Sequence, residues 1–337
     1  MKPTDFARNL TNFLSKYLPG ERGMSTHTIC SYKFAFVLLI TFMDQQKKIN
    51  ASKIELRDIT RESVVGFLDW LQSERKCSTA TRNVRLAAIH SFARFLQYQH
   101  PENINEWQRI LSIKVKKAEK KVINYLSIDG IKLLLEQPDT STHKGRRDLA
   151  MLALMYDCAA RVQEISDLTP CSIRLDKPYT IKIVGKGNKA RIVPLMEEEI
   201  VHIKGYMTEN DLLGAHSRMY PLFFNNRKEK LTRAGINGIL KKYVNMAREI
   251  NSGLIPKISC HSLRHSKAMH LLQAGVNLVY IRDFLGHESV LTTEIYARVD
   301  SKQKREAIEK AYVHIIKKET PAWIENDNLL EWLKNFK

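Results

Sequence analysis

The spacing of apolar residues changes part-way along the chain, and this change limits the possible folds more than any other feature. From Asp5 to about Gln99, apolar side chains recur every three or four positions and polar breaks separate the segments, as they do in helices. The spacing predicts about four helices. Ser25 and Thr60 each precede one of these segments and are predicted to cap its first turn, and a third helix is predicted to start near Ser78.

The second half of the chain has a mixed pattern. Helices are predicted around residues 128–136 and 146–159, followed by two strand-like runs at 180–184 and 190–194. A Gly-Lys-Gly-Asn sequence between the two runs favours a turn, so they are predicted to pair as a β-hairpin. More helices are predicted as far as about Lys318, and one short helix in the tail. The fold class is therefore mainly α with a small β-hairpin or sheet.

A lysine-rich segment separates the two halves. Residues 114–121 read Lys-Val-Lys-Lys-Ala-Glu-Lys-Lys and hold almost no core-forming side chains, so they are predicted to link two domains. We place a helical domain at 1–110, the linker at 111–124, a second domain at 125–318 and a tail at 319–337. Either the linker is simply solvated, or it lies along the phosphates of a nucleic acid.

The chain is strongly basic. Its 54 Lys+Arg against 36 Asp+Glu give a formal net charge of +18, which is typical of proteins that bind polyanions. Nucleic acid is the favoured partner, and a basic surface without a partner, acidic membranes and acidic proteins are the alternatives. Candidate DNA contacts are Arg82 and Arg85 on the third predicted helix, and Lys116 and Lys117 in the linker.

The spacing of the cysteines and the short length of the apolar runs predict a cytosolic protein. The five cysteines are irregularly spaced without a CxxC pair, which indicates neither a zinc cage nor a disulfide framework. The N-terminus lacks the pattern of a signal peptide, and the longest apolar run, residues 34–42, is too short to span a bilayer. We predict a cytoplasmic protein that uses no cofactor.

Six polar residues in the second half have the chemistry needed to cut a phosphodiester. Arginines can clamp the phosphate, a tyrosine can attack it, and a lysine or histidine can move the protons. Their contexts are Ala-Ala-Arg161-Val-Gln-Glu164, Gly-Lys186-Gly-Asn-Lys-Ala-Arg-Ile-Val-Pro-Leu, His261-Ser-Leu-Arg264-His265, Leu-Gly-His287 and Thr-Thr-Glu-Ile-Tyr296.

In this order and context, the motifs resemble those of the tyrosine recombinase (phage integrase, Xer-like) family over nearly the whole chain. The resemblance implies a helical, SAM-like core-binding domain and a mixed α+β catalytic domain, which together form a C-shaped clamp around double-stranded DNA. It also implies a 3′-phosphotyrosyl intermediate, a Holliday junction and a tetramer on paired sites, with neither metal nor ATP. One departure is Cys260, where the family often has a proline.

The resemblance and the chemistry of the side chains give each residue a role. Arg161 and Arg264 would hold the scissile phosphate, and Tyr296 would attack it. The resemblance makes Lys186 the general acid toward the leaving 5′ oxygen, with Lys189 and Arg191 as nearby substitutes, and makes His287 a hydrogen-bond donor to the phosphate. Without the resemblance, we would interpret Lys186 as a solvated charge at the tip of a hairpin.

The remaining site residues are Glu164, His261 and His265. Glu164, three residues after Arg161, is expected to pair with it and to hold it in place. His261 is the candidate for assisting removal of the tyrosine proton. His261 and His265 have the spacing of a zinc pair, but Ser262 replaces the glutamate of a HExxH protease, so we interpret His265 as a buried structural histidine.

Two alternatives to a recombinase remain open from the sequence. One is a type IB topoisomerase-like enzyme, which uses the same chemistry without partner exchange, and the other is a non-catalytic DNA-binding protein. A recombinase would serve the integration or excision of a mobile element, or dimer resolution. The apolar tail from Pro321 to Lys337 would either fold onto its own catalytic domain or dock on a neighbouring protomer.

Overall fold

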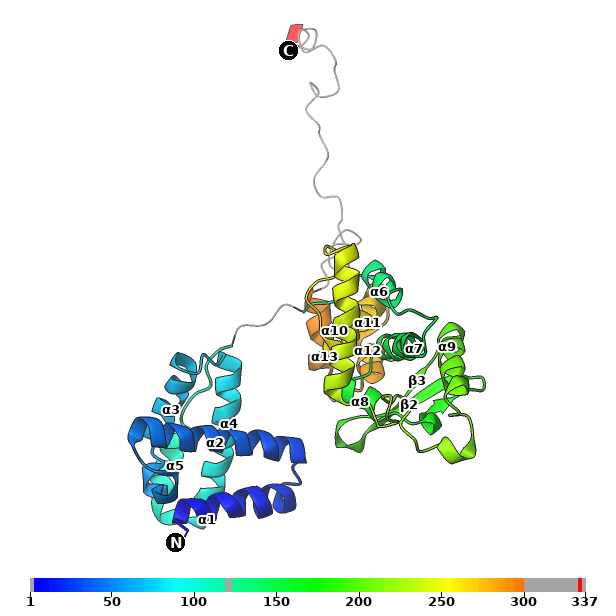
Figure 1. The fold of residues 1–337 in the computed structure, drawn as a ribbon. Helices are drawn as coiled ribbons and strands as arrows, with labels where there is room; N and C mark the ends of the chain where they lie inside the picture. Colours follow the sequence, from blue (N-terminus) through cyan, green and yellow to red (C-terminus); the bar gives the residue numbers. More distant parts are fainter. Residues whose placement is uncertain (1–2, 119–122, 300–332, 335–337) are drawn as a thin grey trace. The chain divides into compact units, whose positions relative to one another are not determined.

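The computed structural model describes residues 3–118, 123–299 and 333–334, apart from the side chains of residues 186, 298 and 299 (Figure 1). Backbone contacts divide the chain into two compact units, residues 1–121 and 122–337. Each unit has a hydrophobic core of its own. The lysine-rich segment therefore lies at the junction of the two units.

The described part of the first unit is helical throughout. Its helix starts confirm the predicted caps, because the side chains of Ser25 and Thr60 each accept a hydrogen bond from the backbone N–H three residues further on. Ser78 caps α4 in the same way, at the predicted start of the third helix. The helices are α1 (Asp5–Asn12), a π-helix (Phe13–Glu21), α2 (Thr26–Lys47), α3 (Arg61–Ser73), α4 (Thr79–Gln99) and α5 (Ile104–Leu111), with short 3₁₀ turns at Ala51–Lys53, Leu56–Asp58 and Pro101–Asn103.

The core of the first unit is built on aromatic rings. Phe13, Phe36 and Phe92 are each at most 2% exposed. The centroid of the Phe92 ring lies 5.1 Å from that of Phe13 and 5.1 Å from that of Phe36. These tilted and edge-on contacts join the π-helix, α2 and α4, and they bury large apolar surfaces.

Helix α2 is long and apolar enough, by length and composition alone, to cross a membrane. The helix extends well beyond the apolar run seen in the sequence. Its Phe36, Leu39, Phe42 and Met43 are at most 4% exposed and belong to the core of the first unit. One side of the helix therefore packs in that core.

The two candidate DNA contacts on α4, Arg82 and Arg85, have partners within the protein. Arg82 is only 4% exposed and its guanidinium donates to Asn83 Oδ1, while Arg85 donates to the Ser31 carbonyl and lies over the Phe34 ring. Tertiary packing draws both arginines toward the protein, which a helix pattern cannot show. Lys116 and Lys117 are exposed, and Lys116 Nζ donates to Gln72 Oε1.

The second unit combines helices with a small sheet. The predicted strands and hairpin are confirmed, with Ile181 opposite Val193 in an antiparallel pair. Residues 300–332 and 335–337 lie outside the described residues, and with them most of the predicted tail. The elements are α6 (Ile128–Leu135), α7 (His143–Asp157), α8 (Val162–Ser166), β1 (Ile173–Arg174), β2 (Thr180–Val184), β3 (Ala190–Pro194), α9 (Glu197–Glu209), α10 (Arg233–Ile250), α11 (Cys260–Gln273), α12 (Leu278–Leu285) and α13 (Val290–Val299).

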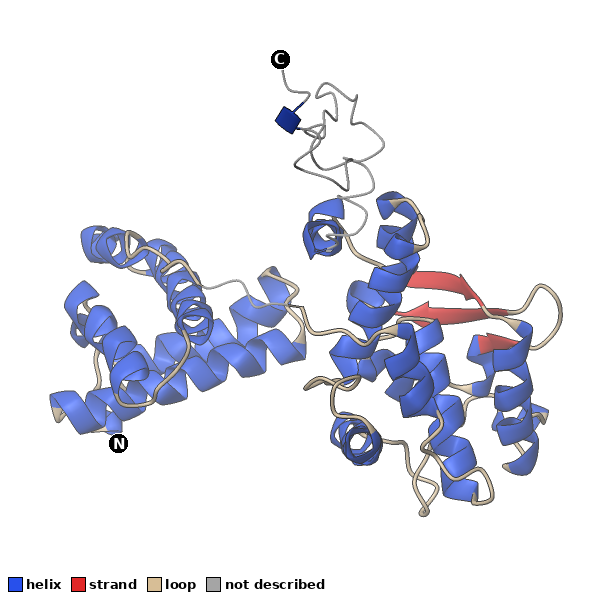
Figure 2. Cartoon of the chain, turned by 90° about the horizontal axis from the view of Figure 1, so that it is seen from above, coloured by secondary structure: helices blue, strands red, loops and turns tan. Residues whose placement is uncertain are grey.

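The sheet has the order β1-β2-β3 and lies at one edge of the helical body (Figure 2). Strand β1 was not predicted, because two residues are too few for an alternating pattern to appear. Ile181, Ile183 and Val193 are fully buried and turn one face of the sheet into the core. The hairpin between β2 and β3 is thereby anchored at its base.

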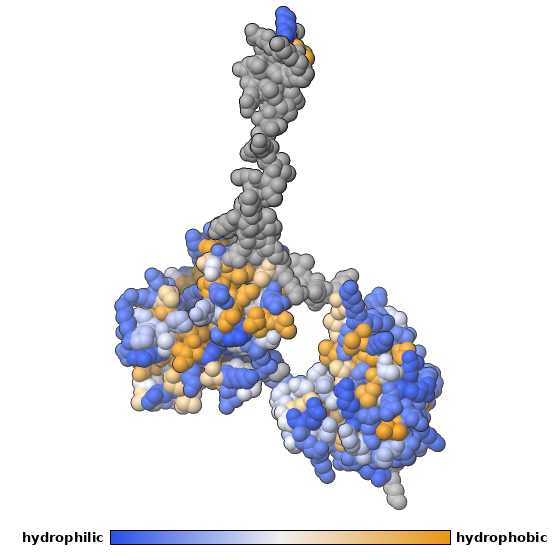
Figure 3. Space-filling model, turned by 180° about the vertical axis from the view of Figure 1, so that it is seen from behind, coloured by the Kyte–Doolittle hydropathy of each residue, from blue (hydrophilic) through white to orange (hydrophobic). Residues whose placement is uncertain are grey.

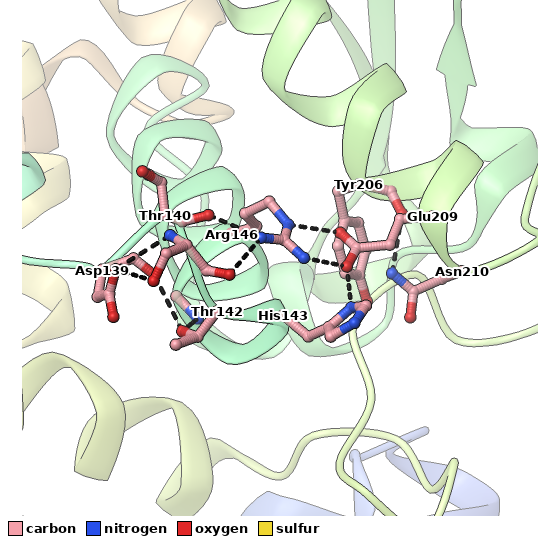
Figure 4. A network of polar contacts seen from close by, with 10 residues as sticks. Asp139, Thr140, Thr142, His143, Arg146, Tyr206, Glu209 and Asn210 are labelled. Atoms are coloured by element: carbon pink, nitrogen blue, oxygen red, sulfur yellow. Dashed lines mark hydrogen bonds and ion pairs between the residues drawn. The ribbon is translucent and has the colours of Figure 1, made fainter.

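A polar network fixes helix α7, whose C-terminal end leads into the candidate site (Figure 4). Arg146 donates two hydrogen bonds to Glu209, of 2.9 Å from Nε and 2.6 Å from Nη2, and also donates to the Thr140 carbonyl. The fork joins the start of α7 to the end of α9. His143 also contacts the Glu209 carboxylate.

Candidate active site

Arg161 stands in the turn between α7 and α8. Ala159, two residues earlier, has a left-handed backbone with φ 46°, and Arg161 is the cap residue of α8. Its backbone N–H donates to Glu164 Oε2 at 2.9 Å, and its Nη1 donates to Oε1 at 2.8 Å. Both bonds to one carboxylate hold the guanidinium beside the start of the helix.

Glu164 is buried and binds two arginines. Besides Arg161, Arg191 on β3 donates to Oε1 at 3.1 Å and to Oε2 at 2.8 Å. Burial acts to raise the pKa of Glu164, but the hydrogen bonds and charges of Arg191 and Arg161 outweigh it, so the pKa lies below its usual value. The carboxylate therefore stays ionised and organises both guanidinium groups.

Arg191, one of the two nearby substitutes for Lys186, contacts the Glu164 carboxylate. The side chain is 9% exposed and is committed to Glu164. Glycine is required beside it, since a Cβ on Gly286, where φ is 63°, would lie 3.2 Å from Arg191 Cδ. The pairing was missed because the two partners are 27 positions apart, although the alternation along β3 places Arg191 on the inward side.

Arg264 is the most buried cation of the site. It is 1% exposed, and it donates from Nη1 to the Ala159 carbonyl at 2.7 Å and from Nη2 to the Leu285 carbonyl at 2.5 Å. Burial, then the charges of Arg161 and Arg191, lower its pKa to about 10, so it remains charged at neutral pH. Its Nε has no partner among the described residues.

Tyr296 on α13 lies against helix α11. It is 1% exposed, and its hydroxyl is 2.9 Å from Nδ1 of His265. His265, which the sequence analysis interprets as a buried structural histidine, is half-buried and contacts the candidate nucleophile. His261, the candidate for removing the tyrosine proton, is exposed, and its ring centroid lies 4.4 Å from that of His265.

His287 follows the left-handed cap Gly286 at the end of α12. Its Nδ1 lies 3.0 Å from Oγ1 of Thr293, one turn before Tyr296 on α13. Burial, and then the charges of Arg264 and Arg161, lower the pKa of His287 to about 4. The ring is therefore neutral at pH 7 and has one N–H to donate.

Lys186 lies in the turn between β2 and β3, but its side chain is outside the described part of the structure. Lys189 is exposed in the same turn and donates to Glu288 at 2.9 Å. A cavity of about 530 Å³ opens between this turn and the end of α12, and Arg161, Arg191 and His287 are among its lining residues. Asp283 and Glu288 also line it, so the fold gathers basic and acidic side chains that are far apart in the sequence around one cavity.

Comparisons with known proteins show the family of this chain. The phage integrase family model matches residues 124–303, and the model of the phage integrase N-terminal SAM-like domain matches residues 10–100. The chain belongs to the tyrosine recombinase family. As a member of this family, it is a recombinase enzyme that acts in site-specific recombination.

Similar recombinases cover almost the full chain. An integrase/recombinase of Sinorhizobium fredii, y4rC, is 32% identical over 99% of this chain and 99% of its own length. The tyrosine recombinase XerC of Thermodesulfovibrio yellowstonii is 31% identical over 90% of this chain and 95% of its own. Among solved structures, a XerH site-specific recombinase in a post-cleavage complex with difH DNA has a TM-score of 0.66 and 25% identity, covering 86% of this chain and 81% of that one.

Glu164→Gln should lower the stability of the folded recombinase. The amide cannot offset the charges of Arg161 and Arg191, so we expect the free energy of unfolding to fall by about 3 kcal/mol, because breaking a buried ion pair leaves uncompensated charge. Glu197→Gln is the matched control, since the Lys177–Glu197 pair is exposed. It should change stability by at most about 1 kcal/mol in the same urea titrations. Equal effects of the two substitutions would contradict the organising role of Glu164.

Proposed function

We propose that this chain cleaves and rejoins duplex DNA through a 3′-phosphotyrosyl link to Tyr296 and exchanges strands through a Holliday junction. The observation that carries the proposal is the placement of the Tyr296 phenol within the electrostatic reach of Arg264 and Arg161. A tyrosine in a basic cluster can attack a phosphodiester while the arginines offset the charge that develops on the phosphate.

Each site residue has a role in this reaction. Arg161 and Arg264 hold the non-bridging oxygens of the scissile phosphate, and the neutral His287 donates a further hydrogen bond. Glu164 holds Arg161 in position, and Arg191 binds the same carboxylate. Lys186 gives its proton to the departing 5′ oxygen, which leaves as a hydroxyl. That hydroxyl, or one from a partner strand, later attacks the phosphotyrosine and releases Tyr296.

The bond energy stays in the phosphotyrosyl link, so rejoining requires neither ATP nor a metal ion. Burial raises the pKa of Tyr296 to about 12, although Arg264 and Arg161 act to lower it. The free phenol is therefore protonated at neutral pH, and a neighbouring group must take its proton during attack.

Double-stranded DNA is the proposed partner. The difH-bound XerH complex has a similar chain fold, and the net charge of +18 suits a polyanion. The helical domain 1–110 and the catalytic domain 125–318, joined by the linker 111–124, would close on DNA as a C-shaped clamp. Four protomers would assemble on paired sites in the cytoplasm.

Trapping the covalent adduct on DNA tests this proposal. Denaturing gels should show a protein–DNA adduct, and sequencing the trapped DNA would reveal whether its site belongs to a mobile element or to a dimer-resolution site. A topoisomerase-like enzyme would relax supercoils without joining two sites. The absence of any adduct would reject the proposal in favour of a non-catalytic DNA-binding protein.

Chelation should leave cleavage unchanged. We expect the same amount of adduct with and without EDTA, because the positive charges that stabilise the transition state come from arginine side chains. Densitometry of the adduct band measures the effect. Loss of adduct in EDTA, followed by recovery with zinc or magnesium, would contradict the metal-free mechanism.

Deleting residues 321–337 should weaken assembly on two DNA sites but leave binding to a single site nearly unchanged. The second unit exposes hydrophobic residues on the face seen in Figure 3. Tyr280 on α12 and Leu291 on α13 are each 70% exposed. We propose that the tail of a neighbouring protomer covers such a surface. Binding to a single site should stay near wild type, while synapsis weakens and the cleavage rate changes. Recombination of two sites at the full-length rate would rule this out.

A further inference from the structure

The hydroxyl of Tyr296 has one described partner, and it is not the expected one. The oxygen is 2.9 Å from Nδ1 of His265, and the two ring centroids are 5.6 Å apart at an interplanar angle of 61°. His261, one turn earlier on α11, contacts the ring of His265 but makes no hydrogen bond to Tyr296 among the described residues. His265 thus stands between His261 and the nucleophile.

The protonation states determine the direction of this hydrogen bond. Burial raises the pKa of the Tyr296 phenol to about 12, while burial and the charges of His261 and Arg264 lower the pKa of His265 to about 4. At neutral pH the phenol therefore donates its proton and the neutral Nδ1 accepts it. The charged or titratable groups that act on the pair are His261 and Arg264 from α11 and Arg161 from the start of α8.

We propose that His265, rather than His261, accepts the phenolic proton of Tyr296 during DNA cleavage. The inference rests on the proposed function. As the Oη–H bond breaks and Nδ1–H forms, Oη bonds to phosphorus, and the bond from phosphorus to the 5′ oxygen breaks. On rejoining, the imidazolium of His265 returns the proton to the departing Tyr296. His261, which is exposed, is left to contact the phosphate.

A second hydrogen bond supports this geometry. Thr293, one turn before Tyr296, is fully buried and lies 3.0 Å from His287 through its Oγ1. Helix α13 is therefore held at two points by histidines of the neighbouring segments. The position of Tyr296 relative to Nδ1 does not depend on the His265 contact alone, so substitution of His265 tests proton transfer with α13 still attached.

The test uses the full-length protein and the DNA site recovered by adduct sequencing, made with sulfur at the bridging 5′ position. Sulfur leaves without a proton, so the general acid no longer influences the rate. Single-turnover adduct formation is measured from pH 6 to 9.5 for wild type, His265→Ala, His265→Asn and His261→Ala. Asn keeps an acceptor near the position of Nδ1 but cannot take the proton.

We expect wild type to have a flat profile, because His265 is deprotonated throughout this range. Both His265 variants should be about 100-fold slower at pH 7, and their rates should rise about tenfold per pH unit as the phenolate becomes populated in water. A flat profile in both His265 variants, or a rising profile in His261→Ala alone, would overturn the inference.

Two controls separate folding and function from proton transfer. His270→Ala removes another histidine–tyrosine hydrogen bond of α11, the 2.8 Å contact with Tyr156, and should keep the flat profile of wild type. Thermal unfolding and gel shifts check that each variant folds and binds. If wild type forms no adduct, the proposed function fails, whereas wild-type adduct with flat profiles in the His265 variants rejects only this inference.

Discussion

Tyr296→Phe is expected to bind DNA like wild type and to form no covalent adduct. The substitution removes only the nucleophilic oxygen and leaves Arg161, Arg264 and Glu164 in place. The buried phenyl ring keeps its packing on α11, and the lost hydrogen bond to His265 should cost about 1 kcal/mol of stability. Gel shifts and denaturing gels on the same DNA measure binding and adduct formation separately.

Tyr280→Phe is the matched control for this experiment. Tyr280 lies on α12 and is 70% exposed, so its hydroxyl should affect neither binding nor adduct formation. Adduct that persists in Tyr296→Phe would show that another residue is the nucleophile. Loss of binding in that variant would show that the phenol also holds the DNA.

Lys186→Ala should slow cleavage of normal DNA by about 10²–10⁴-fold, the usual contribution of a general acid. The 5′ oxygen would then leave without a proton. Replacing that oxygen with sulfur should restore the rate nearly to that of wild type, because a thiolate leaves readily without protonation. Single-turnover rates on the two substrates give the ratio directly.

Lys189→Ala is the control for Lys186→Ala. Lys189 lies in the same turn but donates to Glu288, so its removal should affect both substrates little and equally. Equal impairment of Lys186→Ala on the oxygen and sulfur substrates would remove the general-acid role from Lys186. Rescue of Lys189→Ala by sulfur would transfer the role to that residue.

The sequence by itself determined the parts of this protein that depend on near neighbours. Helix periodicity, the caps at Ser25, Thr60 and Ser78, and the hairpin of β2 and β3 all follow from interactions within a few residues. The pairing of Glu164 with Arg161 was predictable for the same reason, because they are three positions apart. The family motifs predict which residues form the site.

Only the tertiary structure decided which distant side chains meet. Arg191 reaches Glu164 across 27 positions, and His265 reaches Tyr296 across 31. The burial of Arg82, which the sequence suggested as a candidate DNA contact, also depends on packing. Contacts of this kind depend on how whole elements pack and on the charges brought together when water is excluded, and no local pattern in the sequence records either.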